Sequence, residues 1–155
     1  MKKKEREISE IGEIESIVKK ADVCRVAMSN NDVPYIVTMN FGYSDRISRR
    51  LWFHCAAEGR KLDMIRKNNL VCFELDTDHQ LFGGEKACDF GMKYSSVVGW
   101  GRIEILTDNN EKIEGLNYIM AHYSDRTGFS YRQETLDKTV VLRLDIIEMS
   151  GKAKR

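Results

Sequence analysis

Residues 51–68 read LWFHCAAEGRKLDMIRKN. The apolar run at residues 51–55 is typical of a strand, and it is followed by small residues and Gly59. Two adjacent cations, Arg60 and Lys61, then open a segment with helical spacing of its apolar residues. Backbone N–H groups at a helix start point toward an anion, and the two side chains add full charges. The stretch predicts either a phosphate-sized anion site or a solvated basic turn before a surface helix.

The composition is that of an ordinary globular domain. The chain has 155 residues, 42% of them hydrophobic, enough for a core that buries about 70% of the unfolded surface. Lys and Arg total 25 while Asp and Glu total 24, so no net field attracts nucleic acid or an anionic membrane. We therefore expect a single domain over residues 1–155 that binds neither nucleic acid nor membrane.

Targeting signals and cysteine motifs are both missing from the sequence. No apolar run approaches the ~20 residues that span a bilayer, and no apolar segment follows the charged start. We therefore expect a cytoplasmic protein, with frayed and solvated basic ends at residues 2–6 and 152–155.

The cysteines form no C-x-x-C pair, so no metal site is predicted. Cys24, Cys55 and Cys72 lie in apolar runs, where we expect buried free thiols.

Hydrophobic spacing predicts a mixture of helices and strands. Apolar residues recur every three or four positions at about residues 7–20, 59–68 and 109–123, and Asp108 precedes the last of these as an N-cap. Strands are predicted at residues 23–28, 35–41, 51–55, 70–75, 94–106 and 139–147, the first two joined by a turn at residues 29–32. Residues 76–93 are expected to form a loop or a poorly formed hairpin end. Gly99 and Gly101 would bend a long strand, as in a small antiparallel barrel.

Several polar side chains stand where a flat ligand could meet them. Thr38 and Asn40 are two residues apart on a predicted strand and therefore share one face, although an ordinary half-exposed strand has the same pattern. Residues 94–101 offer hydroxyls and an aromatic ring beside glycines. His54 ends the strand before the basic turn and is either a structural hydrogen-bonding residue or a group that titrates near neutrality.

Four motifs in order along the chain resemble one protein family. They are PYIVTMNFGY at residues 34–43, FHCAAEGRK at 53–61, CDFGMKYSSVVGWG at 88–101 and SGK at 150–152. Together they resemble the nitroimidazole-resistance proteins, members of the pyridoxamine-phosphate-oxidase-like group of FMN-binding split barrels. The resemblance implies an α+β fold, an antiparallel split β-barrel with flanking helices.

The resemblance also implies an FMN site in the cleft of a homodimer. Three groups of residues would form it: Val37, Thr38, Met39 and Asn40 along the flavin ring with Phe53 and His54 at its border; Gly59, Arg60 and Lys61 at the phosphate; and Tyr94, Ser95, Ser96 and Val97, contributed by the second protomer. Ser95 departs from the family pattern, which has a larger and often basic residue there.

Two functions from different classes remain open. The first is an FMN-dependent oxidoreductase that passes electrons from NADPH or NADH to a small planar acceptor, such as a nitro-aromatic nitroimidazole, with His54 as the catalytic residue. The second is a non-catalytic flavin- or haem-binding protein, in which His54, His79 or His122 would offer an axial ligand.

Overall fold

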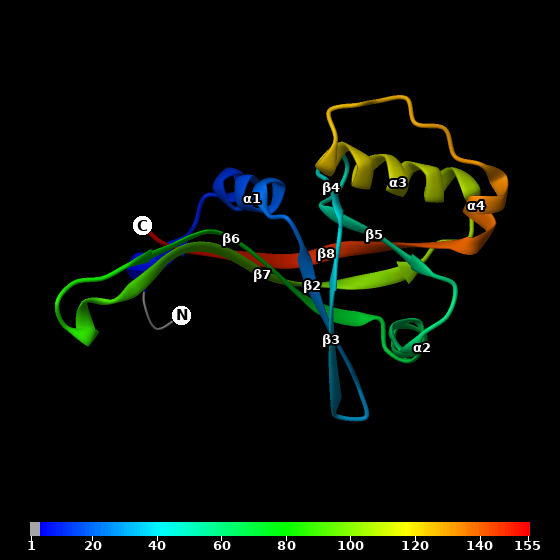
Figure 1. The fold of residues 1–155 in the computed structure, drawn as a ribbon. Coiled ribbons are helices and arrows are strands. Elements are labelled where there is room, and N and C mark those ends of the chain that lie inside the picture. The colour runs from blue at the N-terminus through cyan, green and yellow to red at the C-terminus, as the bar shows by residue number, and fades with distance from the viewer. Residues whose placement is uncertain (1–3) are drawn as a thin grey trace.

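The structure is a computed structural model that describes residues 4–155, and one antiparallel sheet runs through it (Figure 1). Its strands are β1 (Glu7–Ile8), β2 (Cys24–Asn30), β3 (Val33–Met39), β4 (Gly42–Ser44), β5 (Arg50–Ala56), β6 (Leu70–Phe82), β7 (Gly91–Ile105) and β8 (Thr139–Lys154). Its helices are α1 (Ile11–Lys20), α2 (Arg60–Lys67), α3 (Asn109–Tyr123) and α4 (Gln133–Lys138), with short 3-10 helices η1 (Lys4–Arg6) and η2 (Ala87–Asp89). None of the helices within residues 4–155 is long and apolar enough to cross a membrane.

The order of the strands explains why the sheet curls into a barrel. The strands run β3-β2-β6-β7-β8-β5-β4, so β3 and β4 stand at opposite ends of the sheet. Only Asn40 and Phe41 separate these two strands in the chain. The three Cα steps from Met39 to Gly42 span about 11 Å at most, so the two ends of the sheet must meet. Because no ladder pairs β3 with β4 in the described part of the chain, the barrel is split there, which confirms the predicted α+β split barrel.

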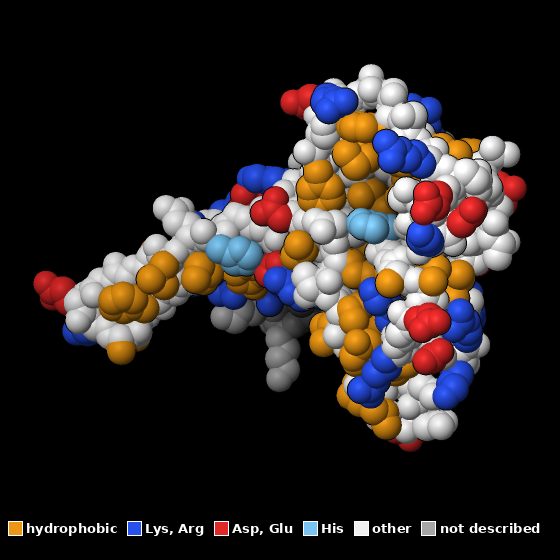
Figure 2. Space-filling model, turned by 45° about the vertical axis from the view of Figure 1, so that its right-hand side comes forward, with side chains coloured by type: hydrophobic (Ala, Val, Ile, Leu, Met, Phe, Trp, Pro, Cys, Tyr) orange, Lys and Arg blue, Asp and Glu red, His pale blue; other side chains and the backbone are white. Residues whose placement is uncertain are grey.

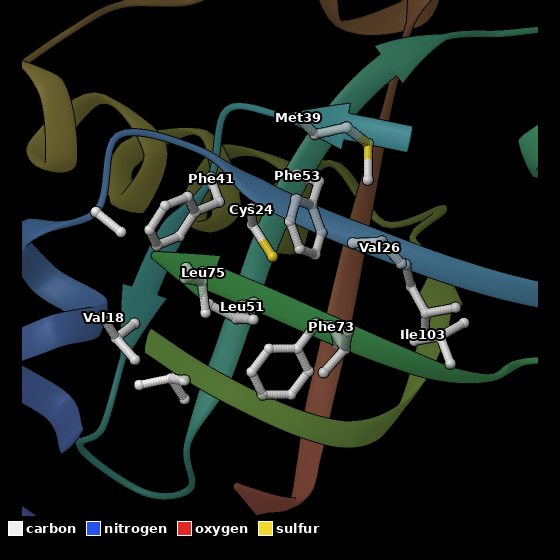
Figure 3. Close-up of a cluster of buried hydrophobic side chains, with 14 of the residues drawn as sticks. Val18, Cys24, Val26, Met39, Phe41, Leu51, Phe53, Phe73, Leu75 and Ile103 are labelled. Atoms are coloured by element: carbon white, nitrogen blue, oxygen red, sulfur yellow. The ribbon is translucent and has the colours of Figure 1, made fainter. Parts of the chain in front are cut away.

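The inside of the barrel is filled by apolar side chains. Figure 3 shows Leu51 and Phe53 from β5 packed with Phe73 and Leu75 from β6, and all four are fully buried. Val18 of α1 joins the same cluster, and so does the buried face of α2. Alternate residues of each strand therefore point inward, as the strand spacing requires.

Helix α3 packs on the outside of β5 over a second, smaller core. Trp52 lies under the helix and stacks on Tyr118, with ring centroids 5.6 Å apart. Gly115 permits this approach, since a Cβ there would lie 2.7 Å from the Trp52 ring. The helix begins as predicted, because the Asp108 carboxylate accepts a hydrogen bond from the Glu111 N–H at 3.0 Å.

The first helix is shorter than its hydrophobic spacing suggests. The spacing predicts a helix over residues 7–20, but α1 begins at Ile11, and Glu7 and Ile8 form β1 instead. This strand pairs with Gly151 and Lys152 of β8. Ile8 is buried in this arrangement, so it is apolar because it packs in the sheet and not because it belongs to a helix.

Residues 76–93 form most of a hairpin, the second of the two predicted alternatives, and it is more fully paired than predicted. Strands β6 and β7 stay paired out to Phe82 and Gly91, and the ribbon projects from the barrel in Figure 1. A bulge between Thr77 and Gln80, with Asp78 at a φ of 60°, marks where it leaves the body. Exposed on both sides, this ribbon has no buried face, and so it lacks the alternation that reveals a strand.

The basic C-terminus is ordered, contrary to the prediction of a frayed end. Strand β8 continues past residue 147, so Lys152 and Lys154 both pair with β7, and Lys152 also pairs with β1. At the other end, Lys4 and Arg6 belong to η1, and residues 2 and 3 lie outside the described residues. Neighbouring strands supply the pairing, which the local sequence does not reveal.

The predicted turn at residues 29–32 and the predicted bend at Gly99 and Gly101 are both present in the structure. The turn at residues 29–32 forms with Asn31 and Asp32 at φ of 49° and 62°, as the hairpin requires. The register of β7 with β8 shifts between Trp100 and Gly101, where a bend is predicted. The free thiol of Cys24 is buried, whereas those of Cys55 and Cys72 are half-buried, and burial raises the pKa of all three.

We predict that the close approach of α3 to β4 makes Gly42 intolerant of a side chain. A Cβ at Gly42 would overlap the backbone of Tyr118, so Gly42→Ala should lower the free energy of unfolding by about 1–3 kcal/mol. Gly12→Ala is the control, because a Cβ there meets nothing within 4 Å, and it should stabilise by up to about 1 kcal/mol. Urea unfolding measures both, and equal stability of wild type and Gly42→Ala would contradict the packing of α3.

Candidate functional site

The start of α2 presents free backbone N–H groups. Gly59 precedes the helix with a φ of 138°, a conformation that favours glycine, and a Cβ there would meet nothing within 4 Å. The first helical hydrogen bond runs from the Leu62 N–H to the Gly59 carbonyl at 3.0 Å. The N–H groups of Arg60 and Lys61 precede it and have no helical acceptor. This turn therefore has both open space and free backbone N–H donors.

Both cations of the turn reach strand β3. The Arg60 guanidinium lies 4.6 Å from the centre of the Tyr35 ring, and Lys61 Nζ lies 3.9 Å from Met39 Sδ. Burial raises the pKa of Cys55, and the charge of Lys61 opposes this shift, so Lys61 is also close to the end of β5. Neither cation forms an ion pair with any carboxylate of residues 4–155. Their charge is free for an anion.

Two open strand edges flank this turn. Strand β3 pairs only with β2, and β4 covers β5 only at residues 50–52. Within the described structure, the outer edge of β3 and the edge of β5 at residues 53–56 therefore carry unpaired backbone groups. Such groups can hydrogen-bond the polar rim of a flat heterocycle.

The predicted polar face is present beside these edges. Thr38 and Asn40 are exposed, whereas Met39 between them is buried. The pairing of β4 with β5 ends where Gly42 lies opposite Trp52, so Asn40 and His54 each lie two residues beyond this last pair, at the split of the barrel. His54 is exposed, and its ring has no hydrogen-bond partner among residues 4–155. Thr38, Asn40 and His54 are therefore exposed polar groups on the two chain segments that border the split.

Three of the predicted contact residues have buried side chains. Met39 and Phe53 point into the core in Figure 3, and Val97 is fully buried on β7. Only their backbone atoms can meet a ligand. Strand alternation explains this, because Thr38 and His54 face outward and their neighbours must face inward. Val37 is half-buried and packs against the same core.

Residues 94–97 lie apart from the other site residues within one protomer. Strands β2 and β6 separate β3 from β7, so the distance across the sheet is about 14 Å at the usual strand spacing. Tyr94 and Ser96 contact Lys152: its ammonium lies 5.9 Å from the Tyr94 ring, and Ser96 Oγ donates to its carbonyl at 3.5 Å. Lys152, with Arg6, lowers the pKa of Tyr94. Ser95 is half-buried on the same strand.

An ion-pair cluster fills the surface between the two groups. Arg25 lies opposite Thr38 on β2 and donates to Glu74 at 2.9 Å and to Asp76 at 2.6 Å. Burial, with Asp76, raises the pKa of Glu74, and Arg25 opposes this shift. His79 Nε2 lies 3.2 Å from Asp76. Arg25 is therefore neutralised by carboxylates, unlike Arg60 and Lys61.

The structure adds three residues to the predicted site: Tyr35 under Arg60, Arg25 beside Thr38, and Lys152 beside Tyr94. Tyr35 and Lys152 lie within two of the quoted motifs, but no site role is predicted for them. The register of the predicted hairpin could have identified Arg25, because it sets residue 25 opposite residue 38. Tyr35 and Lys152 depend on contacts between distant parts of the chain. His122 is also engaged, with Nε2 2.8 Å from the Ala21 carbonyl, so His54 alone of the three histidines is free within residues 4–155.

The fold and the site define a split-barrel protein with a basic site at a helix start. Comparisons of its sequence and its structure with known proteins agree on one family. The family model described as pyridoxamine 5'-phosphate oxidase matches residues 10–153, so the chain belongs to that family. A solved structure from Bacteroides thetaiotaomicron, described as a proposed 5-nitroimidazole antibiotic resistance protein, is 33% identical, with 95% of this chain and 86% of that chain covered and a TM-score of 0.83. The predicted resemblance is thereby confirmed.

More distant solved structures share the fold. The flavocytochrome Anf3 from Azotobacter vinelandii is 20% identical, with 96% of this chain and 69% of that chain covered and a TM-score of 0.81. An FAD- and haem-binding protein from Mycobacterium smegmatis is 15% identical, with 97% and 74% covered and a TM-score of 0.77. No curated protein matches this chain in sequence.

Proposed function

We propose that this protein is an FMN-dependent oxidoreductase that passes electrons from NADPH or NADH to a small planar acceptor, with nitro-aromatics as the acceptor class. The observation that carries the proposal is the start of α2, where two cations without carboxylate partners lie beside the open edge of β3. The Bacteroides relative, described as a proposed 5-nitroimidazole antibiotic resistance protein, supports the acceptor class, and flavin-binding structures with the same fold support the cofactor.

The residues present fit the phosphate end of FMN. The free N–H groups of Arg60 and Lys61, their side chains and the open space at Gly59 form a cradle for a terminal phosphate. FAD and riboflavin lack a terminal monophosphate, so this cradle favours FMN. The backbone of residues 37–40 would bind the rim of the ring, and Tyr35 would hold Arg60 in place.

Bound FMN would accept and release the electrons, and the protein would supply positioning and protons. Thr38 and Asn40 would hydrogen-bond a flat acceptor on the exposed face of the ring. His54 would donate a proton or a hydrogen bond to the acceptor, because its ring has no other partner in the described residues. The described strands form one sheet with no separate nicotinamide domain, so donor and acceptor would use the same face in turn.

A second copy of the chain would complete the site. Ile36, Ala27, Cys72 and Trp100 lie opposite one another across four strands and form an apolar row on the outer sheet face. Ile36 is 61% exposed and Trp100 is 43% exposed, so the row lacks a cover in one protomer. A partner on this face would bring its residues 94–97 toward the cofactor, which one protomer cannot do.

The ribbon beyond the bulge, residues 78–93, extends the same exposed surface. Leu81 and Met92 lie opposite each other and are 67% and 42% exposed. Figure 2 shows apolar side chains along this projecting ribbon. Apolar exposure on a two-stranded ribbon, which is marginally stable alone, is consistent with a partner that packs against it.

The non-catalytic alternative has one specific observation in its favour. His54 is exposed and free, as an axial haem ligand would be, whereas His79 and His122 already have partners. The absorption spectrum of the purified protein separates the two proposals. Bound flavin gives two broad bands in the near-ultraviolet and blue, and bound haem gives a sharp Soret band.

We predict that Lys61→Ala weakens FMN binding and leaves riboflavin binding unchanged. A charge-assisted contact contributes ~1.5–3 kcal/mol, so the dissociation constant for FMN should rise by roughly 10- to 150-fold. Lys67→Ala, at the other end of α2, is the control and should have little effect. Fluorescence titration with both flavins measures this, and unchanged FMN affinity in Lys61→Ala would refute the phosphate site.

We predict a homodimer that depends on the apolar row. Light scattering should give about twice the 17.9 kDa chain mass for the wild type. Trp100→Glu places a charge in the row and should give a monomer, whereas Ile47→Glu, at a residue 92% exposed away from the row, should leave the dimer intact. A wild-type monomer that binds FMN tightly would show that one protomer suffices.

We predict that His54 acts on the acceptor rather than on the cofactor. In stopped-flow experiments NADPH or NADH should bleach the blue flavin band, and a nitro-aromatic should restore it faster than oxygen does. His54→Ala should slow the second step by about 10²-fold while FMN affinity stays within a small factor, and His79→Ala is the control. If neither nicotinamide bleaches the flavin, the non-catalytic alternative is favoured. If His54→Ala is reoxidised normally, His54 has no role in turnover.

A further inference from the structure

A second cleft lies along α3, between the helix and the segment that follows it. Its volume is about 620 Å³, within the usual range of small-molecule sites. The walls are α3, residues 126–129 after it, and Arg46 from the link between β4 and β5. Figure 1 shows the chain after α3 running back along the helix toward α4. None of the lining residues belongs to the candidate flavin site.

The outer wall of the cleft is held against the helix. The Tyr131 hydroxyl donates to Asn117 Oδ1 at 2.9 Å, and the Arg126 N–H donates to Ser124 Oγ at 3.1 Å. Gly128 adopts a φ of 71°, which lets the chain turn back. The Arg126 guanidinium lies 5.2 Å from the centre of the Phe129 ring. These contacts give the wall a defined position.

The floor of the cleft is largely apolar and adjoins the second core, because Tyr118 also stacks on Trp52. Ile113, Tyr118 and Ala121 line it from α3, and Phe129 faces them from the outer wall. The opposite side of α3 already supplies the packing against the barrel through Gly115 and its neighbours. Apolar residues of α3 therefore extend from the second core, through Tyr118, to Ile113 and Ala121 in the cleft. An apolar floor between aromatic rings suits a flat organic body.

The polar groups of the cleft are arranged for an anion. Arg46 and Arg126 both line it, and neither forms an ion pair with any carboxylate within residues 4–155. Asn110 and Asn117 add amide groups. Glu114 is the single carboxylate in the lining, so the net charge is positive, and its oxygens can accept a hydrogen bond from a ligand hydroxyl.

We propose that this cleft is a second ligand site, for a small aromatic monocarboxylate that carries a hydroxyl group. The guanidinium groups of Arg46 and Arg126 bind the carboxylate. The ring lies between Tyr118 and Phe129, and the hydroxyl donates to Glu114. The site is independent of the proposed flavin chemistry, because its residues come from α3, the segment that follows it, and the β4–β5 link.

The test uses 4-hydroxybenzoate as the probe, with calorimetry for affinity and amide NMR shifts for location. The wild-type protein should bind it, with shifts at α3 and at the Trp52 indole, which stacks on Tyr118. Arg46→Gln and Arg126→Gln should each weaken binding by roughly tenfold or more, since each removes a charge-assisted contact. Arg132→Gln, outside the cleft, should not weaken it. The uncharged analogue 4-hydroxybenzyl alcohol should bind less tightly.

Several outcomes would overturn the proposal. No binding at millimolar probe, affinity unchanged in both arginine variants, or shifts confined to residues 59–61 would each do so. Arg126→Gln also removes the contact of Arg126 with Phe129, so it could weaken binding by disturbing the wall of the cleft. Arg46→Gln avoids this problem, because the Arg46 side chain makes no hydrogen bond or ion pair within residues 4–155. Saturating FMN should leave probe affinity unchanged, and competition by FMN would place the probe in the flavin site instead.

Discussion

The link of Asn40 and Phe41 is the constraint on which the site depends. It joins the first and last strands of the sheet, β3 and β4, and thereby forces the sheet to close without pairing its ends. The opening left between them exposes the edges of β3 and β5, and α2 begins beside it. Tyr123 holds the link in place, since its hydroxyl donates to the Asp22 carbonyl at 2.7 Å and accepts the Phe41 N–H at 3.1 Å.

Burial decides which site residues can act through their side chains. Strand alternation sends Met39 and Phe53 into the core and leaves Thr38 and His54 outside. Charge shows a similar division, since Arg25 is paired with carboxylates while Arg60 and Lys61 are not. The candidate site is thus a thin layer of outward groups on a rigid apolar core, with its positive charge concentrated at one helix start.

Much of this arrangement follows from local sequence. Residues 59–61 predict a basic helix start because glycine, cations and helical spacing are neighbours in the chain, and Asp108 predicts a helix start for the same reason. Features set by distant contacts are not predictable in this way. Strand β1 and the end of β8 are stabilised by pairing with each other, and Arg60 contacts Tyr35 only when the barrel has closed. The ribbon at residues 78–93 has no buried face, so its strands show no hydrophobic alternation from which they could be predicted.

The most direct test of the account is a crystal structure of the protein with FMN. The account predicts the phosphate at the start of α2, within hydrogen-bond distance of the N–H groups of Arg60 and Lys61. It further predicts the ring along residues 37–40, with residues 94–96 of a second copy across from it. A phosphate bound elsewhere, or a ring that makes no contact with β3, would contradict the claim that the split in the barrel creates the flavin site.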